Sequence, residues 1–288
     1  MLNVSRPPSS SELSHYVNVI WTYSSEPQHG YEKIVPSVHA QLLINLDGDT
    51  LSHRDLNGLL KRKTGPMGLQ GLLTEPVLIE KNQKTDICGV QFTAMGLSVF
   101  VDQPACAYVN QIVDAVSVWG LSADSLRTSL TTTDDPALRC DFIEAFLVRQ
   151  LRQPGADVDM LRVCVDSLLA GMNVTELQKT VGLSQRKLHD LFDRCIGIKP
   201  KLFSRIARFS RTLPAVSDHE NLTQIAIENG YADHAHMTRE FHWFTGRSPR
   251  AESLIIGEPQ HAYVNPDEIF KNSATEEATL KKNKPDLQ

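Results

Sequence analysis

The sequence lacks any apolar run of about 18 residues, the length that a membrane-spanning helix needs, although 41% of its 288 residues are hydrophobic. The first ten residues, MLNVSRPPSS, also lack the apolar core of a secretory signal peptide. We therefore expect a cytoplasmic protein with no membrane partner. A chain of this length can bury two hydrophobic cores without disulfides or metals, so two domains are expected.

Closely spaced cysteines are also absent. The five cysteines stand 18 to 34 residues apart, and none forms the Cys-x-x-Cys pair typical of zinc or redox sites. We interpret them as reduced thiols, mostly in the interior. They are Cys88, Cys106, Cys140, Cys164 and Cys195.

Charge of one sign does not dominate the chain, because its formal net charge is −5. Residues 1–163 hold 13 Lys and Arg against 18 Asp and Glu, whereas residues 164–256 hold 12 against 10. The second segment is therefore mildly basic. Charge alone does not indicate a nucleic-acid partner.

Two kinds of periodicity divide the sequence. Short strand-like runs at 15–23, 41–46, 76–80 and 87–93 are separated by turn signals and favour a small β-barrel or sandwich. Apolar residues at helical spacing then predict helices over 136–153 and 158–168, with Gln153-Pro154-Gly155 as the break. The polar segment 255–288 has too little apolar surface to offset the entropy of ordering it, so a disordered tail is expected.

The back half contains an internal repeat. TELQKTVGLSQRKLHDLFDRCIGIKP (175–200) matches TQIAIENGYADHAHMTREFHWFTGRSP (223–249) at an offset of 48 that becomes 49 after one inserted residue. Each copy predicts a short helix, a glycine turn, a polar N-cap and a second helix with an apolar stripe. The turn glycines are Gly182 and Gly230, and the N-caps are Ser184 and Asp233. This plan is a helix-turn-helix, present twice.

The second copy resembles the C-terminal signature of the AraC/XylS family of bacterial transcription regulators. The front half resembles, more loosely, the β-barrel sensor domain of some members through YVNVIW (16–21) and IVPSVHAQLLINLDG (34–48). The signature residues are Ile225, Ala226, Gly230, Tyr231, Asp233, Met237, Arg239, Phe241, Phe244, Gly246, Ser248 and Pro249.

The resemblance implies an α+β protein. We expect a β-barrel or cupin-like sensor domain (1–115), a helical linker (116–163) that is also a candidate for dimerisation, an all-α DNA-binding domain (164–254) and the tail (255–288). The implied partners are double-stranded DNA, RNA polymerase, a small-molecule effector and a second copy of the chain. No cofactor is implied.

The second helix of the second copy has two distinct faces. At 100° per residue, Met237, Phe241 and Phe244 fall within about 60° of arc and form the buried stripe. The opposite face carries Ala235, which permits close approach to a major groove, and Arg239, which can donate two hydrogen bonds to guanine. The alternative is that Arg239 is a solvated charge paired with Glu240 or Asp233.

Other chemistry fits this segment poorly. His234 and His236 point about 200° apart on a helix, whereas two metal ligands on one face need a spacing of three or four residues. No serine or cysteine nucleophile accompanies a base and an orienting acid in the motif, so a catalytic triad is not supported.

The first copy departs from the family pattern. Its inner stripe is Leu188, Leu191 and Phe192, so Arg186 and Asp190 lie on the outer face, and Asp190 stands where the second copy has Arg239. Asp190 either accepts from a cytosine amino group or is repelled by phosphates, which leaves Arg186 as the base contact and Arg194 as the phosphate contact. The predicted DNA-binding residues of both copies are Ser184, Gln185, Arg186, His189, Asp190, Arg194, His234, Ala235, His236, Thr238, Arg239 and His242.

The segment 201–213 predicts a helical rod that separates the two recognition helices by about one turn of DNA, near 34 Å, and Pro214 is expected to end it. Arg205, Arg208 and Arg211 along this rod are interpreted as a solvated face, as phosphate clamps or as contacts to the sensor domain.

Candidates for the effector pocket are polar and aromatic residues of the front half. They are Trp21, Tyr23, His39, Gln41 and Tyr108. Two alternatives to an effector-responsive regulator remain: a cupin-type enzyme with a DNA-binding appendage, and a DNA-binding regulator without a ligand. The cupin enzyme needs a His-x-His pair among its metal ligands, and residues 1–120 contain none.

Overall fold

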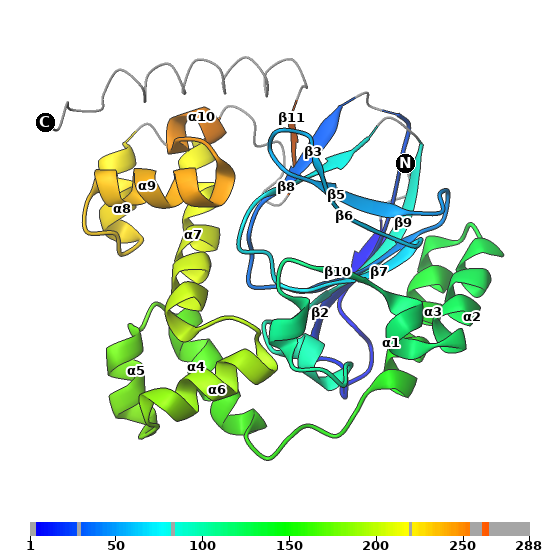
Figure 1. The fold of residues 1–288 in the computed structure, drawn as a ribbon, viewed down its shortest axis with the longest axis horizontal. Coiled ribbons are helices and arrows are strands. Elements are labelled where there is room, and N and C mark those ends of the chain that lie inside the picture. The colour runs from blue at the N-terminus through cyan, green and yellow to red at the C-terminus, as the bar shows by residue number, and fades with distance from the viewer. Residues whose placement is uncertain (1–3, 28–29, 82–83, 219–220, 254–260, 265–288) are drawn as a thin grey trace, which may run out of the picture.

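The computed structural model describes residues 4–27, 30–81, 84–218, 221–253 and 261–264. Its β-strands lie between two groups of helices, with α4–α10 on one side and α1–α3 on the other (Figure 1). All strand pairs are antiparallel. The α+β class is therefore confirmed.

The strands form two sheets. In their order across each sheet, the six-stranded sheet contains β1 (Val4–Arg6), β2 (Val17–Ser25), β9 (Thr85–Phe92), β4 (Gln41–Asn45), β7 (Met67–Gln70) and β10 (Ile112–Asp114). The five-stranded sheet contains β11 (His261–Val264), β3 (Tyr31–Ile34), β8 (Val77–Glu80), β5 (Leu51–Arg54) and β6 (Leu60–Thr64).

The predicted strands are confirmed, but the closed barrel is wrong. Within the described residues, β1 and β10 end one sheet, β11 and β6 end the other, and no pairing joins these edges. A barrel needs every edge strand to be paired. The strands instead form two open antiparallel sheets, and helices pack on one face of the six-stranded sheet. The sandwich alternative stays a prediction.

Part of the segment predicted to be disordered is ordered. Residues 261–264 form β11, which pairs with β3 from Tyr31 to Ile34. The edge of β3 offers unpaired backbone donors and acceptors, and this pairing satisfies them. Residues 255–260 and 265–288 lie outside the described part of the chain.

Helices α1 (Ala115–Trp119), α2 (Leu121–Thr131) and α3 (Pro136–Gln150) belong to the core of the six-stranded sheet. Ile20, Leu42 and Val90 on the strands form one buried cluster with Trp119 and Phe146 on the helices. The rings of Trp119 and Phe146 meet edge to face with centroids 5.3 Å apart. The segment expected to be a linker thus packs on the sheet, and its role as a separate unit stays a prediction.

The remaining helices form the C-terminal domain. They are α4 (Val158–Leu169), α5 (Val174–Val181), α6 (Gln185–Cys195), α7 (Pro200–Asp218), α8 (Leu222–Glu228), α9 (His234–Thr245) and α10 (Pro249–Ser253). The expectation that Pro214 ends the rod is wrong, because α7 continues to Asp218. A proline inside a helix loses one backbone hydrogen bond, and burial of Leu213 and Val216 on either side offsets that loss.

The two domains touch at several places, two of which are a buried ion pair and a close backbone approach. Lys33 on β3 pairs with Glu252 on α10, with 2.6 Å between Nζ and Oε2, and both side chains are at most 2% exposed. The same ammonium donates to the carbonyl of Thr245 at 3.3 Å. At the other place, Gly197 (φ +100°) lies so close to the 3-10 helix η2 (Ala105–Tyr108) that a Cβ there would stand 2.8 Å from the Ala105 carbonyl oxygen.

The Lys33–Glu252 pair generates a stability prediction. Glu252→Ala leaves the Lys33 ammonium buried without its partner, which should lower the free energy of unfolding by about 3 to 5 kcal/mol. Urea denaturation measures this loss. The matched control is Asp47→Ala, which breaks a pair 4.0 Å long with Lys84 in which the side chains are 38% and 58% exposed; it should lose no more than about 1 kcal/mol. Equal losses for the two variants would contradict the prediction.

Candidate nucleic-acid interface

Two helix-turn-helix units stand on the C-terminal domain, α5 with α6 and α8 with α9. In their turns Gly182 has φ +65° and Gly230 has φ +76°, the left-handed region that favours glycine. The Ser184 hydroxyl accepts from the Lys187 amide at 3.3 Å, and the Asp233 carboxylate accepts from the His236 amide at 2.6 Å. The predicted turns, N-caps and repeated plan are confirmed.

Both second helices bury the predicted apolar stripe against α7. Phe209 on α7 contacts Phe241 and Phe244, with ring centroids 5.1 and 5.0 Å apart. One and a half turns earlier on α7, Phe203 contacts Phe192 of the first unit at 5.7 Å. A single helix therefore supports both units, which fixes the spacing of their exposed faces.

The predicted DNA-binding residues divide by exposure. His236 is half-buried with its ring against Tyr231 at 5.4 Å, and the half-buried Thr238 has its hydroxyl in the interior. His189 is also half-buried. The exposed ones are Ser184, Gln185, Arg186, Asp190, Arg194, His234, Ala235, Arg239 and His242.

Arginines of the rod hold α9 in place. The buried Glu240 carboxylate accepts from Arg205 Nε at 2.6 Å and lies 2.9 Å from an Arg208 terminal nitrogen. Arg208 also lies over the Tyr231 ring, 4.5 Å from its centroid, and Arg211 donates to the Leu169 carbonyl. These three arginines make contacts within the domain, which is none of the roles that the sequence suggested.

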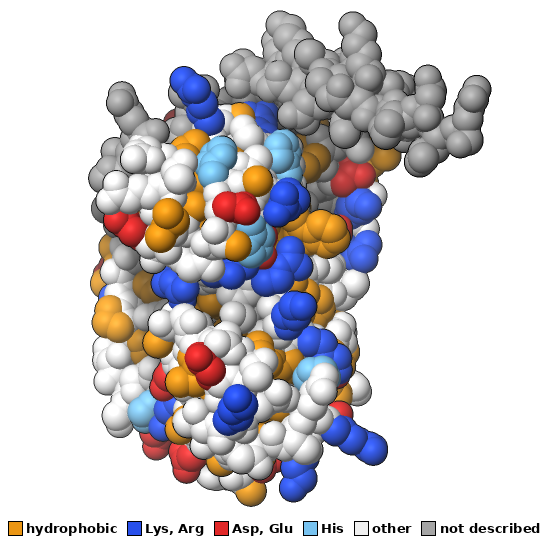
Figure 2. Space-filling model, turned by 90° about the vertical axis from the view of Figure 1, so that its left-hand side faces the viewer, with side chains coloured by type: hydrophobic (Ala, Val, Ile, Leu, Met, Phe, Trp, Pro, Cys, Tyr) orange, Lys and Arg blue, Asp and Glu red, His pale blue; other side chains and the backbone are white. Residues whose placement is uncertain are grey.

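Arg239 remains available at the surface. Glu240 is engaged by α7, and no hydrogen bond or ion pair joins Arg239 to any described residue. Figure 2 shows this face of the molecule, where Lys and Arg side chains gather between the two units and along one edge. The exposed face of α9 thus presents a cation free to meet an anionic partner.

The first unit is electrically more balanced. Arg186 and Asp190 lie one turn apart on α6 with 3.9 Å between their charged atoms, and both are exposed. Arg194 pairs with Asp157 at 2.7 Å. The acid at 190 therefore lies within ion-pair distance of Arg186.

Comparison with known proteins identifies the helical domain. A family profile described as "Helix-turn-helix domain" matches residues 177–252. The chain carries an AraC/XylS-type DNA-binding domain. A second profile, "Domain of unknown function (DUF6597)", matches residues 5–114.

Relatives of the AraC/XylS-type domain have curated names. The "Invasion protein InvF" of Salmonella typhi and that of Salmonella typhimurium are each 34% identical over 88 residues, or 30% of this chain. The chain spans 41% of the length of these relatives.

Solved structures of ToxT from Vibrio cholerae are similar at a lower level. ToxT of strain O395 is 10% identical, with 83% of this chain and 99% of that chain covered and a TM-score of 0.47. The unsaturated fatty acid bound ToxT of strain SCE256 is 11% identical, with 83% and 95% covered and a TM-score of 0.47.

In the described residues, no group of three or more His, Cys, Asp or Glu side chains is arranged to hold a metal ion. His234 is exposed, whereas His236 packs on Tyr231.

Among the described helices, none has the length and apolar character to cross a membrane. Cys88, Cys140 and Cys164 are buried free thiols, as expected, while Cys195 is half-buried and Cys106 is exposed.

Three of the five effector candidates share one face of the six-stranded sheet. Trp21 lies opposite Gly89, Tyr23 opposite Ile87, and Gln41 opposite Gln91 on β9, all on the face away from α1–α3. His39 lies outside the strands, with its ring bonded to the Phe92 carbonyl at 2.9 Å, and burial lowers its pKa. Tyr108 is buried in η2.

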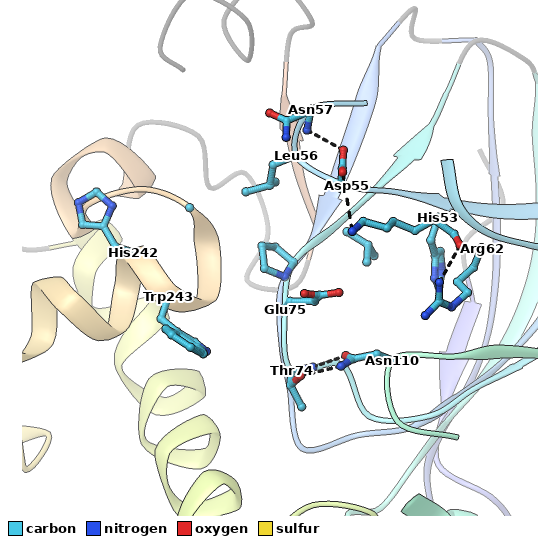
Figure 3. A pocket seen from close by; sticks show the side chains of 14 residues that line it. His53, Asp55, Leu56, Asn57, Arg62, Thr74, Glu75, Asn110, His242 and Trp243 are labelled. Carbon is cyan, nitrogen blue, oxygen red and sulfur yellow. Dashed lines mark hydrogen bonds and ion pairs between the residues drawn. The ribbon is translucent and has the colours of Figure 1, made fainter. Parts of the chain in front are cut away.

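A cleft between the domains was not predicted. It has a volume of about 560 Å³ and lies between β5, β6 and their loop on one side and the C-terminal end of α9 on the other (Figure 3). Its walls come from 53–62, 74–77, Asn110 and 242–246. These segments are distant in sequence, so no motif could have indicated it.

Proposed function

We propose that the chain is a sequence-specific DNA-binding transcription regulator whose N-terminal domain binds a small-molecule effector. The observation that carries the proposal is the pair of helix-turn-helix units supported by the single rod α7, each with a polar exposed face. Recognition helices of this kind read base edges in the major groove. A mildly basic domain of this size also suits attraction to the phosphate backbone.

Arg239 and Arg186 are the proposed base contacts, with the other exposed residues of α6 and α9 around them. Arginine can donate two parallel hydrogen bonds to guanine O6 and N7, a pattern that specifies one base pair. His236 and Thr238 support the helix from inside. Action on transcription through RNA polymerase, homodimer formation and a cytoplasmic location belong to the same proposal.

Effector binding is supported by the sheet face that carries Trp21, Tyr23 and Gln41. Polar and aromatic side chains on a half-buried face are typical of a ligand site. The alternative of a cupin-type enzyme needs a cluster of metal ligands. In the described part of the chain no such cluster is present, so no observation favours that alternative.

Footprinting of the full chain on DNA fragments selected from a genomic library tests the proposal. Two major-groove segments about one helical turn apart should be protected within a site of about 20 base pairs. Protection of a single groove would show that only one unit reads DNA. Absence of any preferred fragment would reject sequence-specific binding.

Arg239→Ala should weaken binding to the selected site by about 1 to 3 kcal/mol and relax the preference at one base pair. Because Arg239 is exposed and unpaired among the described residues, the thermal midpoint should not change. Binding titrations on the specific site and on random DNA measure the effect. Arg149→Ala, an exposed arginine on α3, is the matched control and should change neither quantity. Equal losses on both DNAs would make Arg239 a phosphate contact.

Asp190→Ala should raise affinity for all sequences by about threefold, because it removes a carboxylate near the phosphates and releases Arg186 from its partner. Titrations at matched salt, with Asp190→Asn beside it, measure the change. A loss confined to one C·G pair would instead show that Asp190 accepts from a cytosine amino group.

A further inference from the structure

The cleft beside α9 contains polar groups that the protein leaves without partners. His53 is only 2% exposed, yet its Nε2 atom bonds to no described residue; the ring also has a side-chain hydrogen bond with Gln70. A buried polar atom without a partner costs free energy, and native structures usually satisfy it. Since His53 lines the cleft, a bound molecule is the natural partner.

Some charged side chains in the cleft have no counter-ion among the described residues. Lys61 and Asp55 neutralise each other at 3.9 Å. Among the described residues, Arg62 bonds to neutral oxygens alone, donating to Gln111 Oε1 and to the Lys61 carbonyl, each at 2.8 Å. Glu75, which is exposed, has no cation within ion-pair distance among the described residues. One positive and one negative group therefore line the same cleft without counter-ions.

The sensor wall of the cleft is built rigidly. Asn110 has φ +57°, the one positive value among the described residues other than glycine. Its side chain accepts from the Thr74 amide and donates to the Thr74 hydroxyl, both at 2.7 Å. These bonds fix the chain that leads into Glu75, so the acid is presented from an ordered segment.

The opposite wall presents an aromatic ring. Trp243 on α9 is 64% exposed, an unusual state for so large an apolar side chain, and it lines the cleft. Figure 3 shows His53, Arg62 and Glu75 on the side of the strands and Trp243 on the side of α9. A ligand between these walls meets charged groups at one end and an indole ring at the other.

We propose that this cleft binds a small zwitterion with an apolar side group, the chemical class of a free aromatic or aliphatic amino acid. Its carboxylate accepts from Arg62 and from Nε2–H of His53, its ammonium donates to Glu75, and its side group packs on Trp243. Burial lowers the pKa of His53 to about 4, and the Arg62 charge adds to this, so the ring is neutral near pH 7 and can donate one hydrogen bond. This inference rests on the proposed function, because the zwitterion would be the effector of the regulator. The cleft is a different site from the sheet face that carries Trp21, Tyr23 and Gln41.

Calorimetric titration of the full chain without DNA tests the site. The probes are L-phenylalanine, 3-phenylpropionate, which lacks the ammonium, and 2-phenylethylamine, which lacks the carboxylate. L-phenylalanine should bind at least about tenfold more tightly than either analogue, because each lost group removes a charge-assisted hydrogen bond.

Variants assign each contact. Arg62→Met should abolish the preference for L-phenylalanine over 2-phenylethylamine. Glu75→Gln should abolish the preference for L-phenylalanine over 3-phenylpropionate. Trp243→Ala should weaken all three probes. Lys63→Met removes a cation from the same strand outside the cleft and should change nothing. Glu75 and Trp243 are exposed, so their variants keep the test valid if Arg62→Met fails to fold.

Two results would overturn the inference: failure of L-phenylalanine and L-leucine to bind, or equal affinity for 3-phenylpropionate together with tighter binding by Glu75→Gln. The second result would make the cleft an anion site. Because these titrations contain no DNA, their failure leaves a positive footprint intact, and a failed footprint leaves a measured ligand affinity intact.

Discussion

The buried ion pair between Lys33 and Glu252 is the constraint on which the arrangement of the two domains depends. Two charges removed from water are stable only when their geometry is closely satisfied. Here the ammonium has both a carboxylate and the Thr245 carbonyl as acceptors. Since Thr245 ends α9 and Glu252 lies on α10, this interaction fixes the end of α9 against β3. The cleft beside Trp243 has two walls because of it.

A second buried acid performs the corresponding task inside the helical domain. Glu240 holds Arg205 and Arg208 on its inner side, and its neighbour Arg239 points outward. Adjacent residues of α9 therefore differ in role: Glu240 fastens the helix to its support, and Arg239 is exposed at the surface. Arg205 and Arg208 of the rod are thus used within the fold, whereas most of the other Lys and Arg side chains of 164–256 are exposed.

Features that depend on local pattern could be predicted from the sequence. The turn glycines, the N-caps Ser184 and Asp233 and the stripe of Met237, Phe241 and Phe244 follow from spacing within a dozen residues, and the structure confirms them. The roles of Arg205 and Arg208 could not be predicted, because their partner Glu240 is more than 30 residues away in the sequence and is brought near by packing. The prediction for Pro214 fails for a similar reason. Burial of Leu213 and Val216 stabilises α7 by more than the proline destabilises it. The cleft arises only where four segments of the chain meet.

The close approach of Gly197 to Ala105 has a consequence for the connection between the domains. The first helix-turn-helix unit rests on η2 through this contact, while the second is attached through Lys33, so the helical domain is held at separate points. The covalent link, 151–157, is mostly exposed and without helix or strand, and its residue Arg152 bonds to Val99 and Asp102. These attachments resist rotation about the link, so it does not act as a hinge. A chain cut within it would remain a single particle, its two fragments held together by contacts alone.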